Sequence, residues 1–149
     1  MDDPDKVMEE VKTIARLMFN DFDSSLLMRV FKDIERLFIG KYPGYKGCNT
    51  EYHDFRHTND VFLATARLLH GVHVAGYTIG EDSVNIALIA ALMHDTGYIQ
   101  KDTDSNGTGA KYTSVHVERS VDFMTVYLKS NGLSEYYIED CARIIMSTS

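Results

Sequence analysis

The sequence has little cysteine and lacks a long apolar run. Its 149 residues include only two cysteines, Cys48 and Cys141, too few for a disulfide framework. Two free thiols in a reducing compartment are therefore favoured over a single bridge between them. The longest apolar run covers residues 86–93, whereas a membrane-spanning helix needs about 20 residues. We expect two unbridged cysteines and no contact with a membrane.

Basic residues are also scarce, with 15 Lys and Arg against 22 Asp and Glu and a net charge of -7. This balance disfavours nucleic acids and anionic membranes as partners, because both attract positive surfaces. A small phosphorylated ligand stays compatible, since a local cation can override the overall field. The acidic start, Met1-Asp2-Asp3, is unlike a signal peptide. We therefore expect a cytoplasmic protein, and the sequence predicts no particular oligomeric state.

The spacing of apolar residues predicts helices throughout. A chain of this length favours one domain, and its 44% hydrophobic and 25% charged residues are ordinary for a globular protein. Apolar residues recur with the helical period in six segments, which are residues 5–20, 24–38, 53–69, 84–95, 113–128 and 134–145. No segment alternates with a period of two. We predict a single all-α domain of about six helices over 1–149, with N-terminal helices in 5–40 and the chemistry in 52–149.

Two of these segments carry further expectations. The segment 84–95 is apolar on most sides, so we expect it to form the central helix. The last segment carries Ile138, Cys141 and Ile145 close to Ser149 without a capping signal. This pattern predicts that the parent domain continues with further helices, and that residues 1–149 leave apolar surface of the last helix uncovered.

The first group of candidate functional residues is His53, His57 and Asp60. On a helix, His53 and His57 are one turn apart and share a face. Two neutral imidazoles on one face suit a metal ion, and Asp60 could orient His57 by a hydrogen bond. The alternative is a capped helix start with exposed histidines.

The second group is the pair His94-Asp95 at the end of the most apolar helix. Burying an ionisable pair costs free energy unless something compensates the charge, and a divalent cation would compensate both side chains. Asp95 could also bridge two ions with its two oxygens. The alternative is a polar end to the helix, favoured by the following Gly97.

Together these groups resemble the HD superfamily of metal-dependent phosphohydrolases, in which an isolated His precedes a His-Asp pair in a helical domain. His94 follows His57 by 37 residues, and residues 52–61 (YHDFRHTNDV) are similar to a signature of cyclic nucleotide phosphodiesterases. The resemblance implies an HD-type helical bundle that binds a divalent ion (Mg, Mn, Fe, Zn, Co or Ni). It implies His57, His94 and Asp95 as metal ligands, and His53 as the group that protonates the leaving alkoxide.

The function implied is hydrolysis of a phosphate ester of a nucleotide or cyclic nucleotide by metal-activated water, with His53 and Asp95 at the catalytic centre. His116 follows Asp95 by 21 residues, and some members of the superfamily use such a histidine for a second metal ion. The alternative for His116 is pairing with Glu118 or solvent.

The sequence departs from the phosphodiesterase pattern in three places. Tyr98 stands where those enzymes have a further His, and Asp54 stands for their Asn. The late Asp ligand is missing, because Asp122 and Asp140 both come too early. An alternative function is therefore a catalytically incomplete HD-like module that binds a metal or nucleotide. A zincin-like peptidase, suggested by the His53-Asp-x-x-His57 spacing, is a third.

Overall fold

The computed structural model describes residues 2–149 and contains six α-helices. They are α1 (Pro4–Met18), α2 (Ser25–Phe38), α3 (Phe55–Val74), α4 (Glu81–Met93), α5 (His116–Ser130) and α6 (Glu135–Met146), with 3-10 turns η1 (Thr96–Tyr98) and η2 (Gly109–Tyr112). Within the described residues there is no strand, only an isolated bridge between Tyr45 and Lys101. The prediction of an all-α chain with six helices is confirmed.

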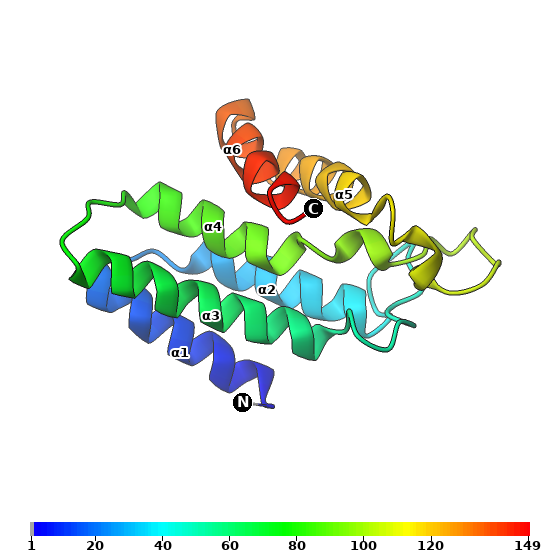
Figure 1. Ribbon diagram of the computed structural model, residues 1–149, viewed down its shortest axis with the longest axis horizontal. Helices are drawn as coiled ribbons and strands as arrows, with labels where there is room; N and C mark the ends of the chain where they lie inside the picture. Colours follow the sequence, from blue (N-terminus) through cyan, green and yellow to red (C-terminus); the bar gives the residue numbers. More distant parts are fainter. Residues whose placement is uncertain (1) are drawn as a thin grey trace.

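Helix α4 lies at the centre of the bundle, as its apolar pattern predicted (Figure 1). It packs against α2, α3 and α6, while α1 packs along α3 and α5 packs on α6 and η1. Most of its side chains from Val84 onward are buried, among them Leu88, Ile89 and Leu92, which are fully inaccessible. The loops before α3 and after α4 meet at one end of the bundle. Among residues 2–149, no helix is both long and apolar enough to cross a bilayer.

Helix α3 is longer than the sequence predicted. We expected it to end near residue 69, with Gly71 beginning the break, but it continues to Val74 and contains Gly71. The glycine that ends it is Gly76, with a φ of 94°. The N–H of Tyr77 donates to the carbonyl of Val72 and the N–H of Gly76 to that of His73. This paired bonding needs a left-handed residue after the helix, so the second glycine, not the first, ends α3.

Two helices begin later than predicted. Helix α3 begins at Phe55, with Asp54 as its N-cap, so His53 precedes the helix and does not share a helical face with His57. The Asp54 side chain accepts a hydrogen bond from the backbone N–H of His57 at 2.8 Å. Helix α5 begins at His116, because residues just before it form η2 and a turn.

Helix α6 buries its apolar stripe but leaves other apolar side chains uncovered, in line with the uncovered apolar surface that we expected on this helix. Ile138, Cys141 and Ile145 are all buried, and the exposed apolar side chains of this helix include Ile144 and Met146. Cys48 and Cys141 are both free thiols, as predicted.

Candidate metal centre

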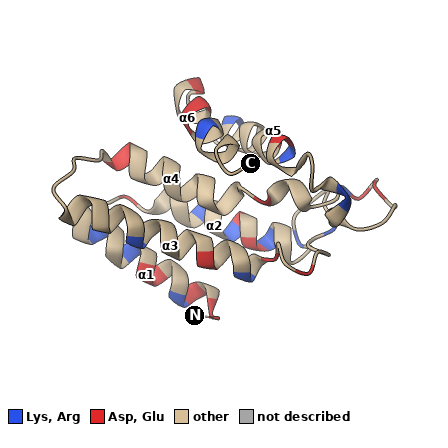
Figure 2. Ribbon diagram, viewed as in Figure 1, with Lys and Arg blue, Asp and Glu red and all other residues tan. Residues whose placement is uncertain are grey.

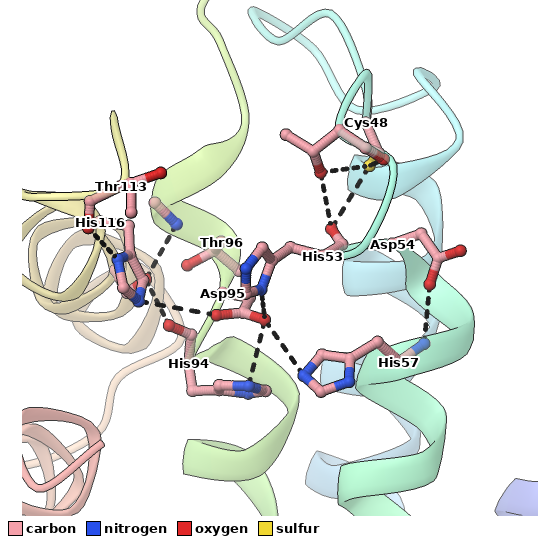
Figure 3. A network of polar contacts seen from close by, with 12 residues as sticks. Cys48, His53, Asp54, His57, His94, Asp95, Thr96, Thr113 and His116 are labelled. Atoms are coloured by element: carbon pink, nitrogen blue, oxygen red, sulfur yellow. Dashed lines mark hydrogen bonds and ion pairs between the residues drawn. The ribbon is translucent and has the colours of Figure 1, made fainter. Parts of the chain in front are cut away.

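Four histidines surround one buried aspartate at the loop end of the bundle (Figure 3). Asp95 is 2% exposed. Its Oδ2 atom lies 2.8 Å from Nδ1 of His53, 3.2 Å from Nε2 of His94 and 3.5 Å from Nε2 of His57. Its Oδ1 atom lies 3.8 Å from Nε2 of His116. The structure thus brings together the five residues for which the sequence resemblance implied metal-binding or catalytic roles, and we call them the His-Asp cluster.

Three of these residues have the spacing of metal ligands. One ligand atom each from His53, His57 and Asp95 lies within 4.8 Å of the other two. Two imidazoles and a carboxylate are a common donor set for zinc and other first-row divalent ions. This group could therefore hold a metal ion, and it includes His53, for which the sequence resemblance implied a proton-donor role instead.

Backbone carbonyls fix two of the imidazoles. Nδ1 of His94 lies 2.7 Å from the carbonyl oxygen of Ala91, and Nδ1 of His116 lies 2.8 Å from that of Thr113. A carbonyl only accepts, so in each ring Nδ1 carries the proton that is donated. In the neutral ring Nε2 then keeps its lone pair and faces Asp95, which is how proteins prepare a histidine for a metal.

Charge reinforces this arrangement. Burial acts to raise the pKa of Asp95, but hydrogen bonds and charges from His94 and His53 outweigh it and lower the pKa to about 2. Burial acts to lower the pKa of His94, but its hydrogen bond to Asp95 and the charge of that carboxylate raise it above the ordinary value. Asp95 is therefore ionised in the folded protein and attracts positive charge. A divalent cation can take the place of the imidazole protons.

His53 is held by the loop that precedes α3. Its carbonyl oxygen accepts hydrogen bonds from Thr50 Oγ1 at 3.2 Å and from Cys48 Sγ at 3.4 Å. Asn49 anchors the same loop, because its amide donates to Gln100 Oε1 and accepts from the N–H of Gly109. These contacts place His53 beside Asp95 although it is not on a helix.

Ser120 joins α5 to the end of α4. Its hydroxyl donates to the carbonyl of His94 at 2.8 Å and accepts from the N–H of Gly97 at 2.9 Å. Ser120 is fully buried, so it satisfies two backbone groups that water does not reach. It therefore fixes the backbone on both sides of Asp95.

Gly97 allows α5 to approach the cluster closely. A Cβ atom at this position would lie 1.9 Å from the carbonyl oxygen of His116, a distance that no side chain tolerates. Arg119 strengthens the junction by donating to the carbonyls of Gly97 and Ile99 at 2.7 and 3.1 Å. The sequence suggested only that Gly97 stops a helix, whereas its missing side chain also lets His116 reach Asp95.

Tyr98 stacks against two of the histidines. Its ring is parallel to His53 at a centroid distance of 4.2 Å and to His116 at 4.4 Å. Tyr98 is 3% exposed, while Tyr52 contacts His53 from the outside and is 70% exposed. The sequence marked Tyr98 only as a departure from a family pattern, and nothing in the local sequence signals the stacking.

The other carboxylates considered in the sequence lie outside the cluster. Asp60 is exposed on α3 and, within the described residues, has no hydrogen bond to His57, so the orienting role does not hold. Asp122 is exposed on α5. Asp140 pairs with Arg143 on α6. His116 faces Asp95 rather than Glu118. Within residues 2–149, Asp95 is the only carboxylate that lines the cavity at the cluster.

A cavity of about 480 Å³ opens beside the cluster. The five cluster residues form one side of it. The rest of its wall comes from three helices: Val61 and Thr65 of α3, Ala87, Ala90 and Ala91 of α4, and Ile144 and Thr148 from α6 and the residues after it. The candidate metal centre is therefore open to a small molecule.

Comparisons with family models, curated proteins and solved structures find no match to this chain. The function of this chain is therefore inferred from the geometry of the His-Asp cluster and from the sequence resemblance.

Proposed function

We propose that the His-Asp cluster holds a divalent metal ion and that the chain hydrolyses a phosphate ester of a nucleotide or cyclic nucleotide. The observation that carries this proposal is the convergence of three imidazole nitrogens on one buried carboxylate oxygen, Oδ2 of Asp95. A metal ion bound there polarises a phosphoryl oxygen and lowers the pKa of water.

His57, His94 and Asp95 are the ligands in this proposal. Asp95 contributes the negative charge, and its burial makes that charge available to a cation at close range. The bond from His94 to the carbonyl of Ala91 keeps its Nε2 directed at the site. His116 is placed in the same way beside the other carboxylate oxygen, so it is the candidate ligand for a second ion.

His53 has two candidate roles. It lines the cavity beside Asp95, with Nδ1 2.8 Å from Oδ2 of that residue, which suits a proton donor to the leaving alkoxide. Its distance to His57 and Asp95 also suits a third ligand. The first role follows the sequence resemblance and the second follows the geometry, so the experiments below separate them.

Metal binding tests the centre directly. Calorimetric titration of the metal-free protein with Mn²⁺ and Zn²⁺ should give saturable binding that Asp95→Asn weakens at least tenfold. Asp60→Asn is the matched control, because Asp60 is an exposed carboxylate just after the same histidine, and it should bind like the unchanged protein. Equal affinity for Asp95→Asn and the unchanged protein would show that the centre is wrongly assigned.

Hydrolysis tests the reaction. The metal-loaded protein should release p-nitrophenol from a p-nitrophenyl phosphate ester, and Asp95→Asn should abolish the release. Metal binding without hydrolysis of any phosphate ester would instead favour the binding-module alternative.

Leaving groups separate the two roles of His53. If His53 is the proton donor, His53→Gln leaves metal affinity unchanged. It then slows an alkyl ester strongly but a p-nitrophenyl ester only weakly, because p-nitrophenolate needs no proton to leave. If His53 is a ligand, the same variant weakens metal binding and slows both esters alike.

A further inference from the structure

Away from the His-Asp cluster, the wall of the cavity is apolar. The alanines Ala87, Ala90 and Ala91 lie on α4, which runs between α3 and α6 (Figure 1). Val61 and Ile144 line the cavity from these two neighbouring helices. Small side chains on the central helix leave room, and the larger apolar ones border it.

No cation is available along this wall. Among residues 2–149, no Lys or Arg lines the cavity. Figure 2 shows α4 without a basic residue along its length. Two basic residues near the cluster are paired elsewhere: Arg56 of α3 lies 3.3 Å from Asp2, and Lys111 of η2 lies 2.6 Å from Asp104.

The two hydroxyl groups of the wall are already engaged as donors. Thr65 Oγ1 donates to the carbonyl of Val61 at 2.8 Å, and Thr148 Oγ1 donates to that of Ile145 at 2.6 Å. A negatively charged group placed in this part of the cavity would give up part of its hydration and find neither a cation nor a free hydroxyl proton. Burying a charge without such partners is costly.

We infer that this cavity takes the apolar, preferably aromatic, remainder of a ligand that carries a single phosphate group, and that it discriminates against ligands with a further anionic group. The inference rests on the proposed function, because the metal ion would hold the one phosphate. A cavity of about 480 Å³ lies within the usual range for small-molecule sites, which are mostly apolar with a few polar groups that fix orientation. Among nucleotides, this selects monophosphates over triphosphates.

Three phosphonates test the inference, because water does not cleave their carbon–phosphorus bond. Calorimetric titration of the Mn²⁺-loaded protein should show phenylphosphonate binding at least tenfold more tightly than methylphosphonate, which lacks the apolar ring. It should also bind at least tenfold more tightly than 4-phosphonobenzoate, which carries the same ring with a second anion at its far end.

Two substitutions of Ala87, which is half-buried in the wall, test whether the preference for the phenyl ring arises in this cavity. Ala87→Phe fills the cavity and should remove the preference for the phenyl ring, while Mn²⁺ affinity stays unchanged. Ala87→Lys supplies the missing cation and should shift the preference toward 4-phosphonobenzoate at least tenfold. Ala64→Phe, an exposed alanine of α3 outside the cavity, should change nothing. Should Ala87→Phe fail to fold, Ala87→Lys still tests the location by a gain of binding.

The outcomes separate this inference from the proposed function. Failure of the unchanged protein to bind Mn²⁺ overturns the proposed function and this inference with it. Normal Mn²⁺ binding with equal affinities for phenylphosphonate, methylphosphonate and 4-phosphonobenzoate, or with no phosphonate binding, overturns the inference alone. A preference for phenylphosphonate that survives in both Ala87 variants also overturns it, because the ring then binds elsewhere.

Discussion

The ring of Tyr98 lies parallel to that of His53, with centroids 4.2 Å apart and 15° between the planes. Because His116 also stacks on this ring, with centroids 4.4 Å apart, one tyrosine contacts the faces of two imidazoles at the candidate metal centre. Stacked aromatic pairs contribute about 0.5–1.5 kcal/mol beyond the area they bury.

Substitution of Tyr98 should separate stacking from simple packing. Tyr98→Phe keeps the ring and should retain Mn²⁺ affinity, whereas Tyr98→Leu frees both imidazoles and should weaken binding by about tenfold. In NMR spectra of the metal-free protein, ring protons of His53 and His116 should lie upfield in the unchanged protein and in Tyr98→Phe, and move downfield in Tyr98→Leu. Similar shifts in the two variants would show that the stacking has no such role. Tyr77→Leu is the control, because Tyr77 is 69% exposed and does not line the cavity at the cluster.

Ser120 should be important for stability. Ser120→Ala leaves the carbonyl of His94 and the N–H of Gly97 without their partner in a buried place. An unsatisfied buried group costs about 1–3 kcal/mol, and we expect a loss of that size in urea-induced unfolding. Ser130→Ala is the matched control, because Ser130 is exposed and bonds only within its own helix. Its loss should stay within about 0.5 kcal/mol. Equal losses for the two variants would contradict the role given to Ser120.

The metal-free protein should lose stability at both ends of the pH range. The folded state raises the pKa of His94 above its usual 6.5, so the stabilisation is present below pH 6.5 and is lost as the pH rises through the folded-state value. The folded state lowers the pKa of Asp95 from 3.8 to about 2, so that stabilisation is present above pH 3.8 and is lost as the pH falls toward 2. Urea unfolding in the presence of a chelator should therefore show maximum stability between about pH 4 and 6.5.

Two substitutions check the assignment of the alkaline change. His94→Asn should flatten the decrease in stability above pH 6.5, because the group that titrates is gone. His70→Asn, on α3 and outside the cluster, should keep the full decrease. The assignment fails when both variants behave alike.

The two cysteines should differ sharply in reactivity. Burial raises the pKa of Cys141 to about 12, and a protonated thiol inside the core is a poor nucleophile. Cys48 is half-buried in the loop before α3. At pH 8, a disulfide reagent such as DTNB should therefore modify Cys48 in the folded protein and Cys141 only after unfolding. Cys48→Ser should abolish the reaction of the folded protein, and Cys141→Ser should leave it intact. Equal rates for the two thiols would place Cys141 outside the core.

The helices follow from local signals in the sequence, so most of the fold could be predicted. The apolar period places α2 and α6 within one or two residues of their observed bounds. The end of α3 was missed because Gly71 and Gly76 look alike in a sequence. What decides between them is the left-handed backbone at Gly76, which depends on how the chain turns toward α4.

The residues of the cluster could be named from the sequence, but their arrangement could not. His94 and Asp95 stand out because a polar pair ends an apolar helix. The position of His53 depends instead on the loop contacts of Cys48 and Thr50, and that of His116 on the close approach at Gly97. Contacts between segments far apart in the chain carry no periodic signal, so Ser120 and Tyr98 were also missed as supporting residues.

The His-Asp cluster joins three stretches of chain: the loop before α3, the end of α4 and the first residue of α5. None of these stretches can present its imidazole correctly until the others have packed, so any partial opening at this end of the bundle disperses the ligands. A metal ion that binds only the assembled cluster then favours the fully folded chain, by about 2.7 kcal/mol at a free concentration 100 times its Kd. The resistance of the protein to proteolysis would then increase with the concentration of that ion in the cell.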